Sequence, residues 1–350
     1  MSFKTRVNHI RRTVIWNLAK SVGNSYTEPE YGSCDVLMIK KVLIIRPNHR
    51  LGNQLLLTPL VQEVTDLFPN CEIDLFVKGG VAHPVFENYK SVINIIKLPK
   101  RPWSHIFKYI KCWLSIKQKK YDFVINGDRT SSSGRLLTQI AKADFKIFGE
   151  VDDSQFKNLD GYQHMSIYPV YNLRLYLKNL GVSMDIVKPV PVLDIKLNET
   201  EIINGKKVLD GVVPDQLKKT ICIYTNATGD KCYSETWWET FYARLLKEYP
   251  DYNVIEMLPI ENISKINFKA PNFYSQDLRE MAAIIRNTSV FIAADNGVMH
   301  LASASLAPTL GFFSVTSLEM YKPYGNGNVA LQTNETTIND WIKAIDNILS

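Results

Sequence analysis

Residues 295–300 combine side chains that can bind an anion with a position that favours one. They read DNGVMH and follow the apolar run SVFIAA (289–294), directly before a predicted helix. A helix start exposes backbone N–H groups and the positive end of the dipole, which suits a diphosphate. Singly, the histidine is expected to pack and the aspartate to cap the helix. Together they predict a ligand site made of Asp295, Asn296, Gly297 and His300.

A second polar loop, NATGDK at 226–231, follows the apolar run TICIYT (220–225) and precedes another predicted helix. Its hydroxyl, its backbone amides and the Lys231 ammonium suit a phosphate group. A polar surface loop is the alternative, and the segment alone does not decide between them.

A third segment, RPNHRLGNQ at 46–54, joins the first apolar run to a predicted helix at 54–68. Its cationic side chains lie near a helix start, where they can meet an acidic acceptor substrate, and its glycine permits a tight turn. The predicted acceptor-binding residues are Arg46, Arg50 and Gly52. The Thr-Pro pair at 58–59 is expected to bend the helix.

Short β-branched strands alternate with amphipathic helices on both sides of these loops. In the first half, strands are predicted at 41–46, 72–77, 92–98, 121–126 and 145–148. In the second half, they are predicted at 220–225, 252–257 and 289–294. This alternation predicts an α/β fold with two doubly wound parallel sheets, and ligands beyond the carboxyl ends of the strands.

A chain of 350 residues exceeds what one core usually serves. We expect an extension and linker at 1–40, an N-terminal Rossmann-like acceptor domain at 41–188, a C-terminal Rossmann-like donor domain at 189–335 and a final helix at 336–350. The two domains are expected to face one another across a cleft. Residues 1–24 form a basic amphipathic pattern, which fits either an anionic inner-membrane leaflet or the protein's own surface.

Composition excludes several classes of protein. Five scattered cysteines without a C-x-x-C pair, and histidines without metal-ligand spacing, predict neither a disulfide framework nor a metal site. No apolar run of about 18 residues occurs, so a soluble or peripheral protein is expected, and the unpaired cysteines indicate reduced thiols in the cytoplasm. The net charge of +6 suits an anionic small molecule or membrane surface and is too small to indicate nucleic acid. No G-x-G-x-x-G follows the first strand, which disfavours an NAD-type oxidoreductase.

Together these segments resemble glycosyltransferase family 9, the ADP-heptose:lipopolysaccharide heptosyltransferases. The likeness lies in VLIIRPNHRLGNQLLLTPLVQEVTDLFP near the N-terminus and in QDLREMAAIIRNTSVFIAADNGVMHLASAS near the C-terminus. It implies a GT-B architecture, metal-independent inverting transfer and no cofactor besides the nucleotide-diphosphate sugar substrate, ADP-heptose by default. It also implies a glycolipid or saccharide acceptor of the cell envelope, and donor contacts at Thr225 and Lys231.

One departure concerns catalysis. The family's Gly-Asp, whose aspartate is thought to be the general base, is Gly52-Asn53 here, and an amide cannot take up the proton. Three alternatives follow: His49 or Asp128 replaces the base, the departing phosphate takes the proton, or the protein binds its ligands without transfer. A different sugar donor on the same scaffold is a further alternative.

Overall fold

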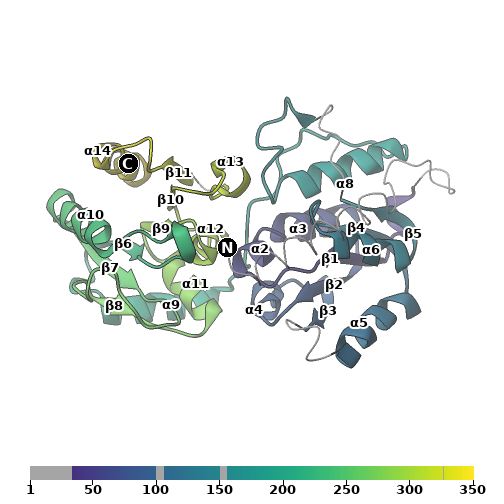
Figure 1. Ribbon diagram of the computed structural model, residues 1–350, viewed down its shortest axis with the longest axis horizontal. Helices are drawn as coiled ribbons and strands as arrows, with labels where there is room; N and C mark the ends of the chain where they lie inside the picture. Colours follow the sequence, from purple (N-terminus) through teal and green to yellow (C-terminus); the bar gives the residue numbers. More distant parts are fainter. Residues whose placement is uncertain (1–33, 100–105, 150–155, 326) are drawn as a thin grey trace, which may run out of the picture. The chain divides into compact units, whose positions relative to one another are not determined.

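The computed structural model describes residues 34–99, 106–149, 156–325 and 327–350. The predicted basic helix at 1–24 lies outside these residues. The chain divides into two compact units (Figure 1). Unit 1 comprises 1–49, 59–83 and 89–191, and unit 2 comprises 50–58, 84–88 and 192–350. Two short stretches of the first half of the sequence therefore fold with the second unit.

Unit 1 is built on a five-stranded parallel sheet of order β3-β2-β1-β4-β5. Its strands are β1 (Lys41–Arg46), β2 (Glu72–Lys78), β3 (Val92–Leu98), β4 (Lys120–Asn126) and β5 (Lys142–Ile147). Its helices are α3 (Thr58–Leu67), α4 (Ala82–Phe86), α5 (Ile106–Gln118), α6 (Ser132–Ile140) and α8 (Tyr168–Asn179), of which α4 ends within unit 2 and Thr58 also belongs to unit 2. The central strand β1 is buried from its second residue onward, as its apolar run predicts.

Unit 2 is built on a six-stranded parallel sheet of order β11-β10-β9-β6-β7-β8. Its strands are β6 (Lys219–Tyr224), β7 (Tyr252–Met257), β8 (Asn272–Phe273), β9 (Val290–Ala294), β10 (Thr309–Phe313) and β11 (Val329–Gln332). Its helices are α2 (Leu51–Leu55), α9 (Glu199–Val212), α10 (Glu235–Glu248), α11 (Leu278–Arg286), α12 (Gly297–Ala304), α13 (Leu318–Tyr321) and α14 (Ile338–Leu349).

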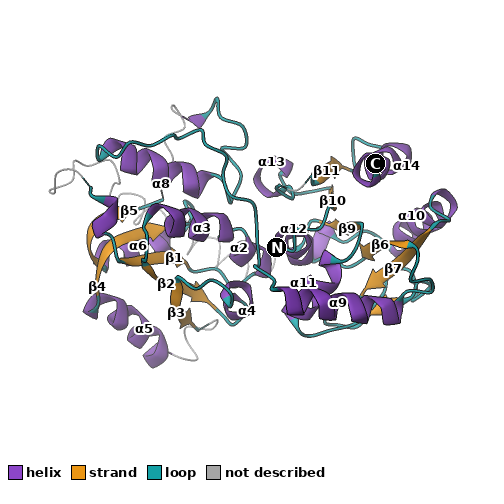
Figure 2. Ribbon diagram, turned by 180° about the vertical axis from the view of Figure 1, so that it is seen from behind, coloured by secondary structure: helices purple, strands orange, loops and turns teal. Residues whose placement is uncertain are grey.

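Figure 2 shows helices on both faces of each sheet. The predicted α/β class with two Rossmann-like parallel sheets is therefore confirmed. In unit 1 the strand order reverses between β1 and β4, and in unit 2 it reverses between β6 and β9. Ligands of open parallel sheets bind beyond the strand ends at such switch points. The loops after β6 and β9 are those that the sequence singled out for phosphate.

The predicted helix at 54–68 is wrong in two respects. It begins earlier, at Leu51, and is interrupted rather than bent, because α2 ends at Leu55 and α3 begins at Thr58. Pro59 lies in the first turn of α3, where its missing N–H costs nothing. The Thr58 hydroxyl donates to the Leu55 carbonyl at 2.8 Å and accepts from the Asp194 amide at 3.2 Å, which holds the interruption in place.

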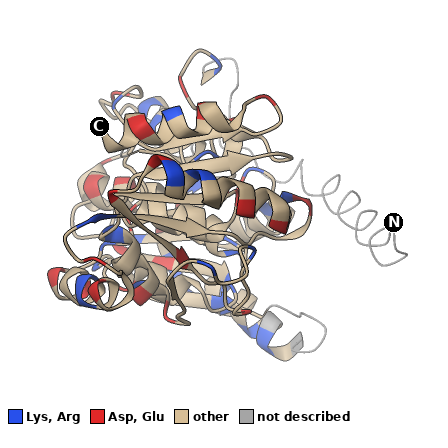
Figure 3. Cartoon of the chain, turned by 90° about the vertical axis from the view of Figure 1, so that its left-hand side faces the viewer, with Lys and Arg blue, Asp and Glu red and all other residues tan. Residues whose placement is uncertain are grey.

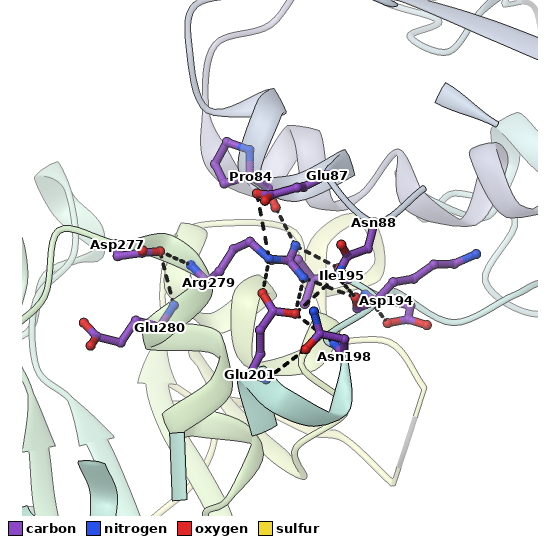
Figure 4. A network of polar contacts seen from close by, with 11 residues as sticks. Pro84, Glu87, Asn88, Asp194, Ile195, Asn198, Glu201, Asp277, Arg279 and Glu280 are labelled. Carbon is purple, nitrogen blue, oxygen red and sulfur yellow. Dashed lines mark hydrogen bonds and ion pairs between the residues drawn. The ribbon is translucent and has the colours of Figure 1, made fainter. Parts of the chain in front are cut away.

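A buried arginine fastens the stretch 84–88 to the rest of unit 2 (Figure 4). Arg279 of α11 forms a two-pronged ion pair with Glu201 of α9, at 2.5 and 2.9 Å. The same guanidinium donates to the Pro84, Ile195 and Lys196 carbonyls at 2.8, 3.2 and 3.1 Å. One side chain thus joins α9, α11, the start of the 192–350 segment and the inserted stretch.

No helix among the described residues is long and apolar enough to cross a membrane.

Candidate functional site

The ends of β6 and β9 bring two of the predicted phosphate loops together. The Lys231 ammonium, in the loop after β6, pairs with the Asp295 carboxylate, directly after β9, at 2.5 Å. The Thr316 hydroxyl, beyond β10, donates to the same Asp295 oxygen at 2.5 Å. We call these three residues the strand-end cluster. It joins three neighbouring strands of the sheet through one carboxylate.

The charges of the strand-end cluster differ in exposure. The Asp295 side chain is 5% exposed, whereas that of Lys231 is 28% exposed. Within the described part of the chain, the Lys231 ammonium makes one hydrogen bond, to Asp295. An ammonium has three N–H donors, so two remain for a ligand. The buried aspartate fixes the direction of the lysine, and the lysine supplies the positive charge that an anion needs.

The first turn of α12 is capped by Asn296 and not by Asp295, for which a capping role was the alternative to ligand binding. The Asn296 side-chain oxygen accepts from the Val298 and Met299 amides at 2.7 and 2.9 Å. Its amide group donates to the Asn226 carbonyl at 3.0 Å and thereby ties α12 to the loop after β6. Because the cap engages two of the first-turn amides, the Gly297 amide is the one that the cap leaves to a ligand.

The helix α2 packs against α12 within unit 2, through two glycines. A Cβ on Gly52 would lie 2.8 Å from His300 Cδ2, and a Cβ on Gly297 would lie 3.1 Å from Leu51 Cβ. Gly52 is inside a helix, so the predicted tight turn is wrong and close packing explains the glycine. His300 is 3% exposed and its ring lies against Gly52. Leu51 and Gly52, from the unit 2 part of the predicted acceptor loop, therefore lie beside the predicted donor signature.

Thr225 lies in a buried carboxylate pocket rather than in the strand-end cluster. Its hydroxyl donates to Glu256 Oε1 at 2.6 Å, and the Ser264 hydroxyl donates to Glu256 Oε2 at 2.6 Å. Burial raises the pKa of Glu256, and the two hydroxyl donors offset part of that rise. Thr225 is 1% exposed. It therefore holds the carboxylate at the end of β7.

In unit 1, Arg46 is fully buried at the end of β1. Its guanidinium donates to the Gly127 carbonyl at 2.9 Å and the Met165 carbonyl at 3.4 Å. The Tyr168 hydroxyl also donates to Gly127 O and accepts from the Arg129 amide. Arg46 therefore fastens the β1 and β4 ends together, and its charge is not presented at the surface.

The candidates for the general base lie in different settings. Asp128 is 7% exposed, and its Oδ1 accepts from the Thr130 amide at 3.0 Å and from the Thr130 hydroxyl at 2.8 Å. His49 and Arg50 are exposed, and Asn53 is half-buried in α2. The loops that carry His49 and Asp128 follow β1 and β4, the two strands at the switch point of unit 1.

Comparison with known proteins shows a family resemblance over part of the chain and a fold over most of it. Residues 275–342 match the family model of glycosyltransferase family 9 (heptosyltransferase). No curated protein sequence matches the chain.

The resemblance to glycosyltransferase family 9 is confirmed.

Three solved structures resemble the chain over most of its length. A glycosyl transferase family 9 protein from Veillonella parvula is 15% identical, with a TM-score of 0.71 over 91% of this chain and 99% of that one. E. coli ADP-heptose lps heptosyltransferase II is 15% identical, with a TM-score of 0.62 over 88% and 98%. E. coli heptosyltransferase WaaC with ADP is 17% identical, with a TM-score of 0.62 over 88% and 99%. At these identities the likeness concerns the fold, which is that of the GT-B glycosyltransferases.

The glycosyltransferase family 9 match spans α11, β9, α12, β10, α13, β11 and the start of α14. It therefore contains Asp295, Asn296, Gly297 and His300, and also Thr316, which the sequence analysis missed. Thr316 follows β10, a strand that was not predicted although TLGFF (309–313) is a fully buried run after a proline. Extending the strand-end rule to that run would have pointed to the loop that carries Thr316. Among the described residues, no group of three or more His, Cys, Asp or Glu side chains could hold a metal ion.

Proposed function

We propose that the protein is an inverting glycosyltransferase that needs no metal ion and transfers a sugar from a nucleotide diphosphate to a hydroxyl of a cell-envelope saccharide or glycolipid. The default donor is ADP-heptose. The observation that supports this most directly is the strand-end cluster, where a partly exposed lysine with spare N–H donors lies beside the start of α12. The family match agrees with this choice, as does the similarity to a heptosyltransferase that was solved with ADP.

In the proposed reaction, the acceptor oxygen attacks the anomeric carbon while the bond from that carbon to the diphosphate oxygen breaks. Lys231 and the Gly297 amide stabilise the charge that develops on the leaving diphosphate. Attack from the face opposite the leaving group inverts the anomeric centre. The Lys231 ammonium neutralises the departing anion, which is a role that a bound metal ion has in other transferases.

The acceptor proton needs a destination, because Asn53 cannot accept it. We propose His49, which is exposed in the loop after β1. Asp128 is the less suitable of the two side chains, because its carboxylate is buried and already accepts two hydrogen bonds from Thr130. We place the reaction in the cytoplasm, with the acceptor at the inner face of the membrane.

Two steps test the proposal. First, thermal shift with ADP-, GDP- and UDP-linked sugars is expected to show stabilisation by one nucleotide, because a ligand that binds the native state raises its stability. Second, Lys231→Ala is expected to weaken that stabilisation and slow transfer at least tenfold, whereas exposed Lys247→Ala leaves both unchanged. Equal effects of the two variants would contradict the assignment of Lys231.

The general base is tested separately. His49→Ala is expected to lower turnover at least tenfold with unchanged donor binding, and His83→Ala, on another exposed histidine, serves as the matched control. Unchanged turnover in His49→Ala eliminates that residue. Donor binding without turnover on any acceptor would favour the second candidate function, a non-catalytic nucleotide-sugar or glycan-binding protein, which Asn53 motivates.

A further inference from the structure

The outer face of α5 is an exposed apolar stripe on a basic helix. Phe107, Ile110 and Leu114 are 85%, 48% and 49% exposed. Ile110 and Leu114 follow Phe107 by three and seven residues in a 13-residue helix, so all three side chains lie on one face. Large apolar side chains exposed as a group, unlike scattered ones, indicate an interaction surface. We call these three residues the α5 stripe.

The opposite side of α5 packs normally, so the α5 stripe is not the result of a misplaced helix. Ile116 is fully buried in the core of unit 1 with Leu98, Tyr121 and Val124, and Cys112 and Trp113 pack against that core. A register in which the α5 stripe faced inward would expose Ile116. The helix therefore has two apolar faces, one used by the core of unit 1 and one directed to solvent.

Lysines flank the α5 stripe. Helical geometry places Lys108 and Lys111 on one side of it and Lys117 on the other, and all three are exposed. Within the described residues none of the three forms an ion pair, whereas the next lysines along the chain, Lys119 and Lys120, pair with Asp74 and Asp144. The flanking charge is therefore available to a partner.

The surrounding sequence carries the same sign of charge. No Asp or Glu occurs between Glu87 and Asp122, while nine Lys or Arg do. In Figure 3 acidic and basic residues are mixed over most of the helices in view, in contrast to α5, whose sequence IFKYIKCWLSIKQ has no acidic residue. A partner that buries apolar side chains and also carries dense negative charge fits this surface.

We propose that the α5 face binds an anionic lipid surface, with the α5 stripe in the interface and Lys108, Lys111 and Lys117 at the headgroups. Helices with an apolar face and flanking lysines bind in the plane of the interface, and each lysine brought to an anionic surface strengthens binding about fivefold. A protein partner would supply the apolar contact but has no general reason to be anionic across the whole face. This proposal does not depend on the transfer reaction.

The test uses the full chain and sedimentation with vesicles of phosphatidylcholine containing phosphatidylglycerol, against vesicles of phosphatidylcholine alone. Phe107→Ser combined with Leu114→Ser is expected to lower retention on the anionic vesicles at least tenfold. Lys108→Glu combined with Lys111→Glu is expected to do the same, since two favourable charges are lost and two repulsive ones gained. Retention of the unchanged chain on phosphatidylcholine alone is expected to be weak.

Matched controls lie on unit 2. Leu217 and Ile260 are 97% and 68% exposed, so Leu217→Ser with Ile260→Ser removes comparable apolar area. Lys207 and Lys247 are exposed, and their replacement by Glu matches the charge change. Both control variants are expected to retain full binding. Circular dichroism and thermal unfolding confirm that each variant is folded, and transfer to a soluble acceptor separates this proposal from the proposed function.

Three outcomes overturn the proposal. Unchanged retention in both α5 variants would assign any vesicle binding to another part of the chain, such as residues 1–24. Equal retention on vesicles with and without phosphatidylglycerol would remove the role of the lysines. A change from dimer to monomer in the α5 variants without lipid, measured by light scattering, would identify a second copy of the chain as the occupant.

Discussion

Unit 2 contains two partly buried ion pairs that differ in how many N–H donors of the cation are engaged. Arg279 donates to both oxygens of Glu201 and to three backbone carbonyls. Lys231 donates to Asp295 alone within the described residues and is 28% exposed. A guanidinium with every donor engaged has no capacity for a ligand, whereas a partly exposed ammonium has. The first pair therefore holds the fold together, and the second is suited to an anion.

A second comparison within unit 2 concerns two carboxylates. The Arg279 guanidinium lowers the pKa of Glu201, whereas burial raises the pKa of Glu256 at the end of β7. A carboxylate whose partner is a cation stabilises the fold in its charged form. A carboxylate that accepts hydrogen bonds only from neutral hydroxyls has no nearby cation to offset the unfavourable burial of its charge. Perturbation of this second kind is more typical of functional sites than of structural ones.

The largest effect is expected from Arg279→Met. It leaves Glu201 without its cation and removes the arginine donor from the Pro84 and Ile195 carbonyls, while the Lys196 carbonyl keeps a hydrogen bond from Asn88. We therefore expect a loss of about 3 kcal/mol in stability, as for other broken ion pairs of low exposure. Urea unfolding measures it. Arg286→Met is the matched control on the same helix, because Arg286 is exposed and, among the residues that the structure describes, donates only to the Leu306 carbonyl. A loss as small as that of the control would show that the Arg279 network is not structural.

Asp295→Asn tests the strand-end cluster. The change is nearly isosteric but removes the charge that directs Lys231, so we expect transfer efficiency to fall about 100-fold, or about 2.7 kcal/mol. Steady-state kinetics with the nucleotide sugar measure it, and exposed Asp230→Asn, next to Lys231 in the loop after β6, is the control. If activity survives while stability falls, the pair is structural like Arg279–Glu201, and the contrast between the two pairs disappears.

Gly52→Ala probes the contact between α2 and α12. The new Cβ would lie 2.8 Å from His300 Cδ2, so the histidine ring must move. We expect transfer to fall about tenfold, although alanine favours the helix by up to about 1 kcal/mol. Gly80→Ala is the control, because its Cβ would meet nothing within 4 Å. The transfer rates of both variants are compared at saturating donor. Identical rates would show that the position of the His300 ring does not affect transfer.

The smallest effect is expected in the dependence of stability on pH. The pKa of Glu256 is raised, so the native state binds its proton more readily, and stability falls as pH rises from about 4.5 through the native pKa. The pKa of Glu201 is lowered, so its contribution is present above about 4.5 and is lost as pH falls further. Glu256→Gln is expected to remove the first slope, and Glu201→Gln the second. Urea midpoints between pH 3 and 8 measure both, and slopes of the same sign would contradict the assignment.

Local sequence determined the order of helices and strands and the class of fold. The runs KVLIIR, YDFVIN and SVFIAA are apolar and β-branched, and each became a buried strand at nearly its predicted bounds. Their alternation with amphipathic helices predicts a parallel sheet covered by helices, because this arrangement buries the apolar faces of both. The loops after β6 and β9 were also located from sequence, because a parallel sheet places the ends of its strands along one edge.

Tertiary structure decided which partner each polar group obtained. Sequence could not show that Arg46 donates its hydrogen bonds to carbonyls of distant loops. It also could not show that the Thr225 hydroxyl donates to Glu256, or that the Thr316 hydroxyl donates to Asp295. Nor could it assign α2 to unit 2, where Gly52 meets His300. The hydrogen bonds among these contacts join residues between 21 and 119 positions apart, and Gly52 and His300 are farther apart still. Hydrophobic periodicity is a local property, whereas a hydrogen bond depends on where the folded chain brings two distant groups together.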